Sequence, residues 1–197
     1  MNRDESQIEH SRGFDLHLRG LVAEAEGFYR KALTLDPLSR DASYILVRML
    51  WASGQHAEAR QAARTMADRN MPGCHETVGY VALLDRNVAQ ADVEFHMEPV
   101  HMVRLYTTAV SQYSLGHFTA ADDALSQLVK NFSKTLAYQI AEIYAWRGDR
   151  DKAFEWLETA YRQRDRGLTQ LRFDPLLANL RTDPRYRTIL QRLGLPE

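Results

Sequence analysis

The sequence predicts an all-α superhelix of about five helix-turn-helix repeats, closed by a C-terminal pair of capping helices. Three observations predict this fold class. A Gly-x-x-x-x-Ala motif recurs in one phase along the 197 residues, and glycine and proline are sparse, at ten and six in the whole chain. Between the motifs, apolar residues recur at three- and four-residue steps, as in Leu125, Leu128 and Val129. This periodicity is typical of amphipathic helices.

Copies of the motif begin at Gly20, Gly54, Gly116 and Gly148, and a further copy at Arg86 keeps the alanine but loses the glycine. The steps between the copies are 34, 32, 30 and 32 residues, which indicates stacked two-helix units. Glycine suits the turn between two helices because it adopts the left-handed backbone conformation at little cost. Alanine lets the second helix approach the first closely.

The repeat pattern resembles the tetratricopeptide repeat family. The first and last repeats carry the fullest signature, at Gly13, Leu16, Ala25, Tyr29, Ala32 and Pro37, and at Ala141, Tyr144, Ala153, Leu157 and Ala160. The third repeat is degenerate, with only Ala82 and Ala91 fitting well. The resemblance implies a single array over residues 1–197, with repeats at about 6–39, 40–71, 72–99, 100–133 and 134–166 and a cap at 167–197.

Two Asp-Pro pairs predict how the cap is built. Asp174-Pro175 and Asp183-Pro184 each place an N-cap residue before a proline suited to the first helical position. The second helix is expected to run to Gly194. The stretch 153–195 also resembles the tail of tetratricopeptide arrays in bacterial adenylate-cyclase-like and serine/threonine-kinase-like regulators, where the array is a sensor or scaffold joined to a catalytic domain.

In the family, the first helix of each repeat lines the concave wall, and residues at i, i+4 and i+7 or i+8 share one helix face. Together these imply a column of wall residues: His10, Phe14 and His17; Tyr44, Arg48 and Trp51; Glu76, Tyr80 and Leu83; Tyr106, Val110 and Tyr113; and Tyr138, Glu142 and Trp146. All except His10, Glu76, Leu83 and Val110 are candidate partner-binding residues. Tyrosine and tryptophan suit binding because they bury apolar area and keep a polar tip. The alternative is that these aromatics pack in the core.

The family's best-known ligand site is a clamp of Lys, Asn and Arg for the C-terminal carboxylate of a chaperone. The matching wall positions here hold His10, Phe14 and Tyr44, and only Arg48 is basic. We therefore expect a protein or peptide partner with apolar or aromatic anchors instead of a chaperone tail.

No catalytic or metal-binding set is predicted. His75-Glu76 begins like a zinc-protease motif, but Gly79 stands where the second histidine should be. His96 and His101 are five residues apart with a proline between them, so they share no helix face. Cys74-His75 has no third orienting group. We expect a protein that is not an enzyme and needs no cofactor.

Charge and composition favour a cytoplasmic protein. The net charge of −1 gives no global attraction to nucleic acid or membranes. A single cysteine fits a reducing compartment, and the polar N-terminus shows no secretion signal. The cap is locally basic, with arginines at 162, 164, 166, 172, 181, 185, 187 and 192. A solvated helical face accounts for such a run.

The sequence thus predicts a non-catalytic scaffold that binds a partner peptide or helix in an aromatic-lined concave groove. Two alternatives stay open. The array could regulate a signalling enzyme of the cyclase or kinase type, as the resemblance of the tail implies. The arginine-rich cap could also bind an anion or nucleic acid.

Overall fold

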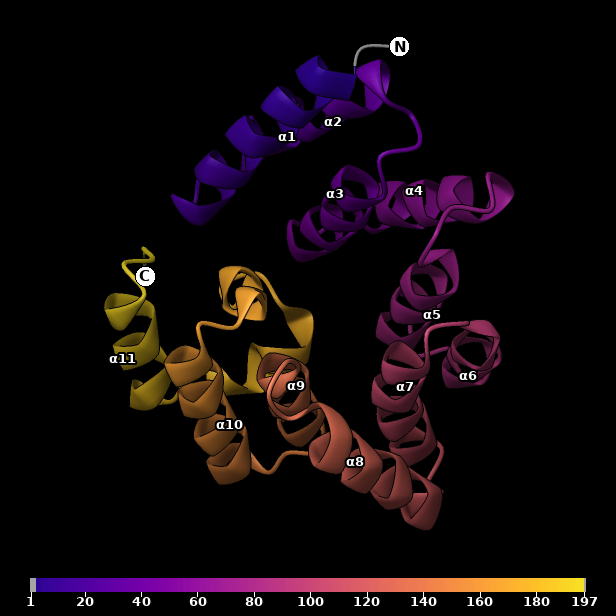
Figure 1. Ribbon diagram of the computed structural model, residues 1–197, viewed down its shortest axis with the longest axis vertical. Coiled ribbons are helices and arrows are strands. Elements are labelled where there is room, and N and C mark those ends of the chain that lie inside the picture. The colour runs from indigo at the N-terminus through magenta and orange to yellow at the C-terminus, as the bar shows by residue number, and fades with distance from the viewer. Residues whose placement is uncertain (1–2, 197) are drawn as a thin grey trace. The chain divides into compact units, whose positions relative to one another are not determined.

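The computed structural model describes residues 3–196 and confirms the all-α class: across that range it contains helices and no strand (Figure 1). The helices gather into two compact units, one up to Val81 and one from Ala82 to Leu195. The boundary between the units falls inside α5 (Cys74–Leu84). Within the described residues, no helix has the length and apolar character needed to cross a membrane.

In the first four helices of the first unit, the first packs on the second, the second on the third and the third on the fourth. These helices are α1 (Arg3–Leu18), α2 (Val22–Leu35), α3 (Arg40–Ala52) and α4 (His56–Asp68). Helix α1 packs closely on α2 because Gly13 has no side chain. A Cβ atom there would lie 3.3 Å from the backbone oxygen of Ala25 and 3.3 Å from the Tyr29 ring. Tyr29, like Ala25, is fully buried in this contact.

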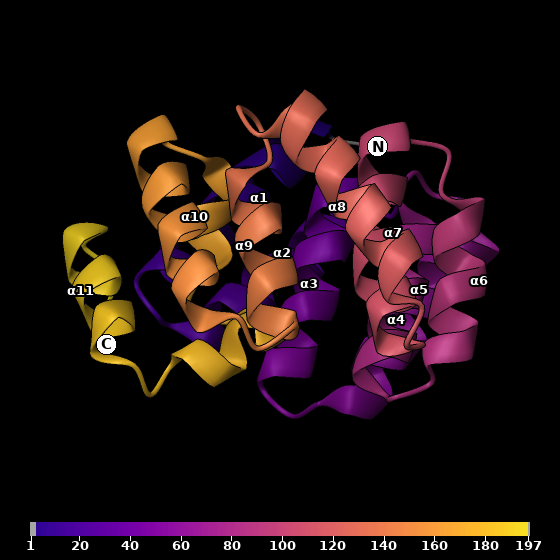
Figure 2. The same ribbon diagram turned by 90° about the horizontal axis from the view of Figure 1, so that it is seen from below.

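The second unit continues the pattern, and Figure 2 shows its hairpins α7–α8 and α9–α10 in the foreground. Its elements after α5 are α6 (Val88–Met97), α7 (His101–Ser114), α8 (Phe118–Phe132), α9 (Ala137–Trp146), α10 (Arg150–Gln163), the 3-10 helices η1 (Arg166–Gln170) and η2 (Pro175–Leu180), and α11 (Pro184–Arg192).

The repeated motif has the predicted structural role at every copy. Its glycines at 20, 54, 116 and 148 have φ values of 78°, 81°, 81° and 81°, and its alanines at 25, 59, 91, 121 and 153 are fully buried. The turn is closed by bonds such as that from Gln55 N to Leu50 O, at 2.8 Å. Arg86, where the glycine is lost, keeps the same left-handed conformation with φ 64°. The architecture therefore imposes the turn even where the sequence disfavours it.

Both Asp-Pro pairs start helices, as the sequence predicts, and the first of these is a 3-10 helix. Asp174 Oδ1 accepts a hydrogen bond of 2.9 Å from Leu176 N, and Asp183 Oδ1 accepts one of 2.9 Å from Arg185 N. A further 3-10 helix, η1, precedes them and was not expected. Its N-cap, Asp165, accepts a bond of 2.9 Å from Gly167 N.

The 3-10 helices η1 and η2 pack on α9, and α11 packs on α10. The second contact is a ladder of two arginines. Arg185 pairs with Asp151 at 2.8 Å and lies 4.2 Å from the centre of the Phe154 ring. One helical heptad later, Arg192 pairs with Glu158 at 2.6 Å and lies 4.0 Å from the Tyr161 ring.

Candidate peptide-binding surface

The candidate site of the first unit is a set of aromatic and charged side chains on α3 and α5. Tyr44 and Arg48 share one face of α3, and Glu76 and Tyr80 share one face of α5, because each pair is four residues apart. Arg48 Nη1 donates a hydrogen bond of 3.0 Å to Tyr44 Oη, which donates one of 3.3 Å to Glu76 Oε1. The Arg48 guanidinium carbon lies 4.4 Å from the centre of the Tyr80 ring.

Arg40 extends this set, although the helical spacing of the wall residues did not include it. Its guanidinium carbon lies 5.6 Å from the centre of the Tyr44 ring, and its Nη2 lies 3.7 Å from Glu76 Oε2. Arg40 stands four residues before Tyr44, so one more step of the i, i+4 pattern would have found it. We call Arg40, Tyr44, Arg48, Glu76 and Tyr80 the α3–α5 cluster.

The α3–α5 cluster has a buried base and an accessible edge. Arg48 and Tyr80 are only 8% and 5% exposed, so they fix the positions of the other side chains. Tyr44 is half-buried and Arg40 is exposed, and the Glu76 side chain keeps 13% of its surface exposed. A ligand that reaches this edge meets an aromatic ring, a guanidinium and a carboxylate.

The α1 and α3 candidates outside the cluster differ in accessibility. Phe14 is half-buried and His17 is buried. The Trp51 ring is stacked on His56 of α4, with 4.3 Å between ring centres and 14° between planes, so it packs within its own repeat. His10 lies edge-on to Tyr29 at 5.4 Å. Burial lowers the pKa of His10, and the Asp41 carboxylate partly opposes that shift.

In the second unit, Tyr113 and Trp146 are half-buried and join α7 to α9. Trp146 Nε1 donates a hydrogen bond of 2.8 Å to Ser114 Oγ. Tyr113 Oη donates one of 3.4 Å to the backbone oxygen of Arg147, whose guanidinium carbon lies 4.9 Å from the Tyr113 ring centre. These two aromatics are the candidates of this unit that keep accessible ring surface.

Three other candidates of the second unit are covered. Tyr106 is buried, and Tyr138 and Glu142 are each 1% exposed. Tyr138 Oη donates a hydrogen bond of 2.8 Å to Asp174 Oδ2, which lies just before η2. The η1 backbone passes so close that a Cβ at Gly167 would lie 2.5 Å from the Tyr138 ring. The segment that contains η1 therefore occupies the space that a peptide would need in order to contact Tyr138.

Acidic neighbours neutralise part of the positive charge of the cap. Besides its pair with Asp151, Arg185 Nη2 lies 2.8 Å from Asp183 Oδ2 and lowers the pKa of Asp183 to about 2. Arg192 is paired with Glu158. The two arginines therefore serve the contact between α10 and α11. Among the described residues, no group of three or more His, Cys, Asp or Glu is arranged to hold a metal ion.

The model of the tetratricopeptide repeat family matches residues 16–73 and 106–167. The chain therefore belongs to the tetratricopeptide repeat family. Proteins of this family are generally non-catalytic scaffolds that bind protein or peptide partners. A search of curated proteins finds no match.

Solved structures share the fold at low sequence identity. PilF of Pseudomonas aeruginosa is 17% identical with a TM-score of 0.57, and the match covers 97% of this chain and 93% of that chain. A tetratricopeptide repeat protein of Parabacteroides merdae is 12% identical with a TM-score of 0.50, over 97% and 79%. YrrB, described as having an unusual peptide-binding site, is 17% identical with a TM-score of 0.49, over 87% and 92%. At these identities the first two similarities show the fold alone.

Proposed function

We propose that this protein is a non-catalytic scaffold that binds a segment of a partner protein at the accessible edge of the α3–α5 cluster. The observation that carries the proposal is the ladder of contacts from Arg48 to Tyr44 and from Tyr44 to Glu76. It holds the Tyr44 ring in one orientation before a ligand arrives. Preorganisation of an aromatic anchor reduces the entropy lost on binding.

The chemistry of the cluster indicates what the partner segment carries. The Tyr44 ring offers a flat apolar face to an apolar or aromatic side chain. Arg40 is exposed, and its nearest carboxylate oxygens are Asp41 Oδ1 at 3.3 Å and Glu76 Oε2 at 3.7 Å. Neither contact is short for a charge-assisted bond, so Arg40 can exchange them for a carboxylate of the ligand. We infer a segment with an apolar anchor next to an acidic residue.

Phe14 in the first unit, and Tyr113 and Trp146 in the second, are secondary candidates for contact with the partner. Each is half-buried, so each retains ring surface that binding could cover. Tyr138, Glu142 and Tyr106 are left out of the proposed surface because they are buried.

Capture of partners from a cell extract by variants of the full chain tests the proposal. Tyr44→Ala and Arg40→Glu should each reduce capture of a specific partner at least tenfold, because losing a Tyr or Arg hot spot costs about 2 kcal/mol or more and about 1.4 kcal/mol already corresponds to a tenfold change. Leu38→Ser is the matched control, since Leu38 is 56% exposed and lies just before α3. Equal capture by Tyr44→Ala, Arg40→Glu and Leu38→Ser, with circular dichroism showing all three folded, would contradict the proposal.

A further inference from the structure

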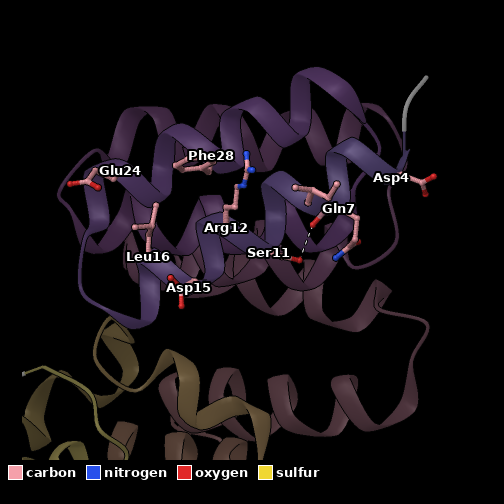
Figure 3. Close-up of a pocket in the computed structure, with 9 residues that line it drawn as sticks. Asp4, Gln7, Ser11, Arg12, Asp15, Leu16, Glu24 and Phe28 are labelled. Carbon is pink, nitrogen blue, oxygen red and sulfur yellow. Dashed lines mark hydrogen bonds between the residues drawn. The ribbon is translucent and has the colours of Figure 1, made fainter.

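A second surface lies between α1 and α2, on a side of α1 different from the one that carries Phe14 and His17. It is a groove of about 840 Å³, and Figure 3 shows its side chains. Ile8, Leu16 and Phe28 supply the apolar part of its lining. Ile8 is 51% exposed, and together with Leu16 and Phe28 it forms an apolar patch that a partner could cover. We call this surface the α1–α2 groove.

Acidic side chains dominate the charge of the α1–α2 groove. Asp4, Asp15 and Glu24 line it, against a single cation, Arg12. Arg12 is itself paired with Glu9 at 3.3 Å. Asp15 lies 3.5 Å from Arg19, and both side chains are about two-thirds exposed, so water screens this contact. The groove therefore combines an apolar floor with an anionic rim.

The dimensions of the α1–α2 groove fit a helix. Asp4, Ile8 and Asp15 follow one another along one side of α1 at spacings of four and seven residues. With a rise of 1.5 Å per residue, the stretch from residue 4 to residue 15 extends over about 16 Å, or three helical turns. A groove between two packed helices accepts the side-chain ridge of a third helix.

We propose that the α1–α2 groove binds a cationic amphipathic helix of a partner protein. Apolar side chains at i, i+3 or i+4, and i+7 would contact Ile8, Leu16 and Phe28, and flanking Lys or Arg would face Asp4, Asp15 and Glu24. A second copy of this chain fits less well. Its most basic helix, α11, buries its apolar residues Tyr186, Ile189 and Leu190 and has no such stripe to offer.

Two synthetic peptides of three to four helical turns test the proposal with the full chain. One carries leucines at helical spacing flanked by lysines, and the other has glutamates in place of the lysines. Fluorescence anisotropy should show at least tenfold tighter binding of the lysine peptide, weakening as salt is raised. Amide chemical shifts should change along α1 and α2. Equal affinity of the two peptides, or shift changes confined to other helices, would overturn the proposal.

Variants at exposed positions locate the binding. Ile8→Ser should lower the affinity for the lysine peptide at least fivefold. The double variant Asp15→Lys with Glu24→Lys should lower it at least as much. Tyr44→Ala should leave its affinity unchanged, which separates this site from the α3–α5 cluster. If the chain self-associates in sedimentation experiments and Ile8→Ser abolishes that association, a second copy occupies the groove and the partner-helix proposal is wrong.

Discussion

The guanidinium of Arg48 lies over the ring of Tyr80, 4.4 Å from its centre, and both side chains are buried. A desolvated cation over an aromatic ring contributes about 2 kcal/mol. We therefore expect Arg48→Ala to lower the free energy of unfolding in urea by about that amount. In the background of Tyr80→Leu the same change should cost less, because the shared contact is already lost. Equal costs in both backgrounds would show that the two residues are not coupled.

Gly13 and Gly27 form a matched pair in the first repeat. A methyl group at Gly13 would lie 3.3 Å from a backbone oxygen and from two side-chain atoms, whereas one at Gly27 would meet nothing within 4 Å. Gly13→Ala should lower the melting temperature because α1 must move away from α2. Gly27→Ala should raise stability by about 0.5–1 kcal/mol, since it removes a flexible residue from the middle of a helix. The reverse order of the two melting temperatures would contradict the packing described.

Arg86 is a non-glycine residue in the left-handed turn between α5 and α6, with φ 64°. Arg86→Gly should stabilise the protein by about 1 kcal/mol, because the left-handed conformation costs an L-residue with a side chain roughly that much. Gly116→Arg, at φ 81° in the equivalent turn, should destabilise it by a similar amount. Both effects can be read from urea unfolding curves. A loss of stability in Arg86→Gly would mean that contacts of the arginine side chain stabilise the protein by more than the left-handed backbone costs.

Gly167 is needed for η1 to pack on Tyr138. Gly167→Ala should loosen the segment from η1 to η2, at a cost of about 1–3 kcal/mol, because its Cβ would lie 2.5 Å from the ring. Hydrogen exchange should then speed up across residues 166–180. Thr169→Ala is the control, because the Thr169 hydroxyl donates only to the Arg166 backbone within the same turn. In this variant, exchange across residues 166–180 should be unaltered. Unchanged exchange in Gly167→Ala would contradict the close approach.

His10 should make stability depend on pH. Because burial lowers its pKa below 6.5, the unfolded chain binds the proton more readily than the folded chain. The contribution of His10 to the free energy of unfolding is complete above about pH 6.5 and is lost as the pH falls from 6.5 through the lowered pKa. His10→Phe keeps an aromatic ring against Tyr29 but cannot titrate. Between about pH 7 and pH 5 the original protein should lose more stability than His10→Phe, and equal losses would show that His10 has an ordinary pKa.

The repeat architecture was predictable because its signals are local. The turn glycines and the buried alanines occupy fixed positions in each hairpin, and all of them take the expected conformation or burial. The Asp-Pro pairs likewise marked the starts of η2 and α11. That the first of these is a 3-10 helix, and that η1 precedes it, depends on how the segment packs on α9, which no local pattern encodes.

The candidate surface was only partly predictable because accessibility depends on neighbouring elements. Helical spacing placed Tyr44 and Arg48 on one face of α3, and Glu76 and Tyr80 on one face of α5, and these four are in contact. The same spacing chose Tyr138, which a segment that ends 36 residues later in the chain covers, as its bond to Asp174 shows. A pattern within one helix cannot reveal what a distant segment buries.

Hydrogen exchange of the protein with and without a captured partner tests the central claim most directly. If the α3–α5 cluster binds the partner, exchange should slow in α3 and in the part of α5 around Glu76. The slowing should disappear in Tyr44→Ala and persist in Leu38→Ser. Protection found only in α1 and α2, or only in the cap, with exchange in α3 and α5 unchanged, would contradict the claim.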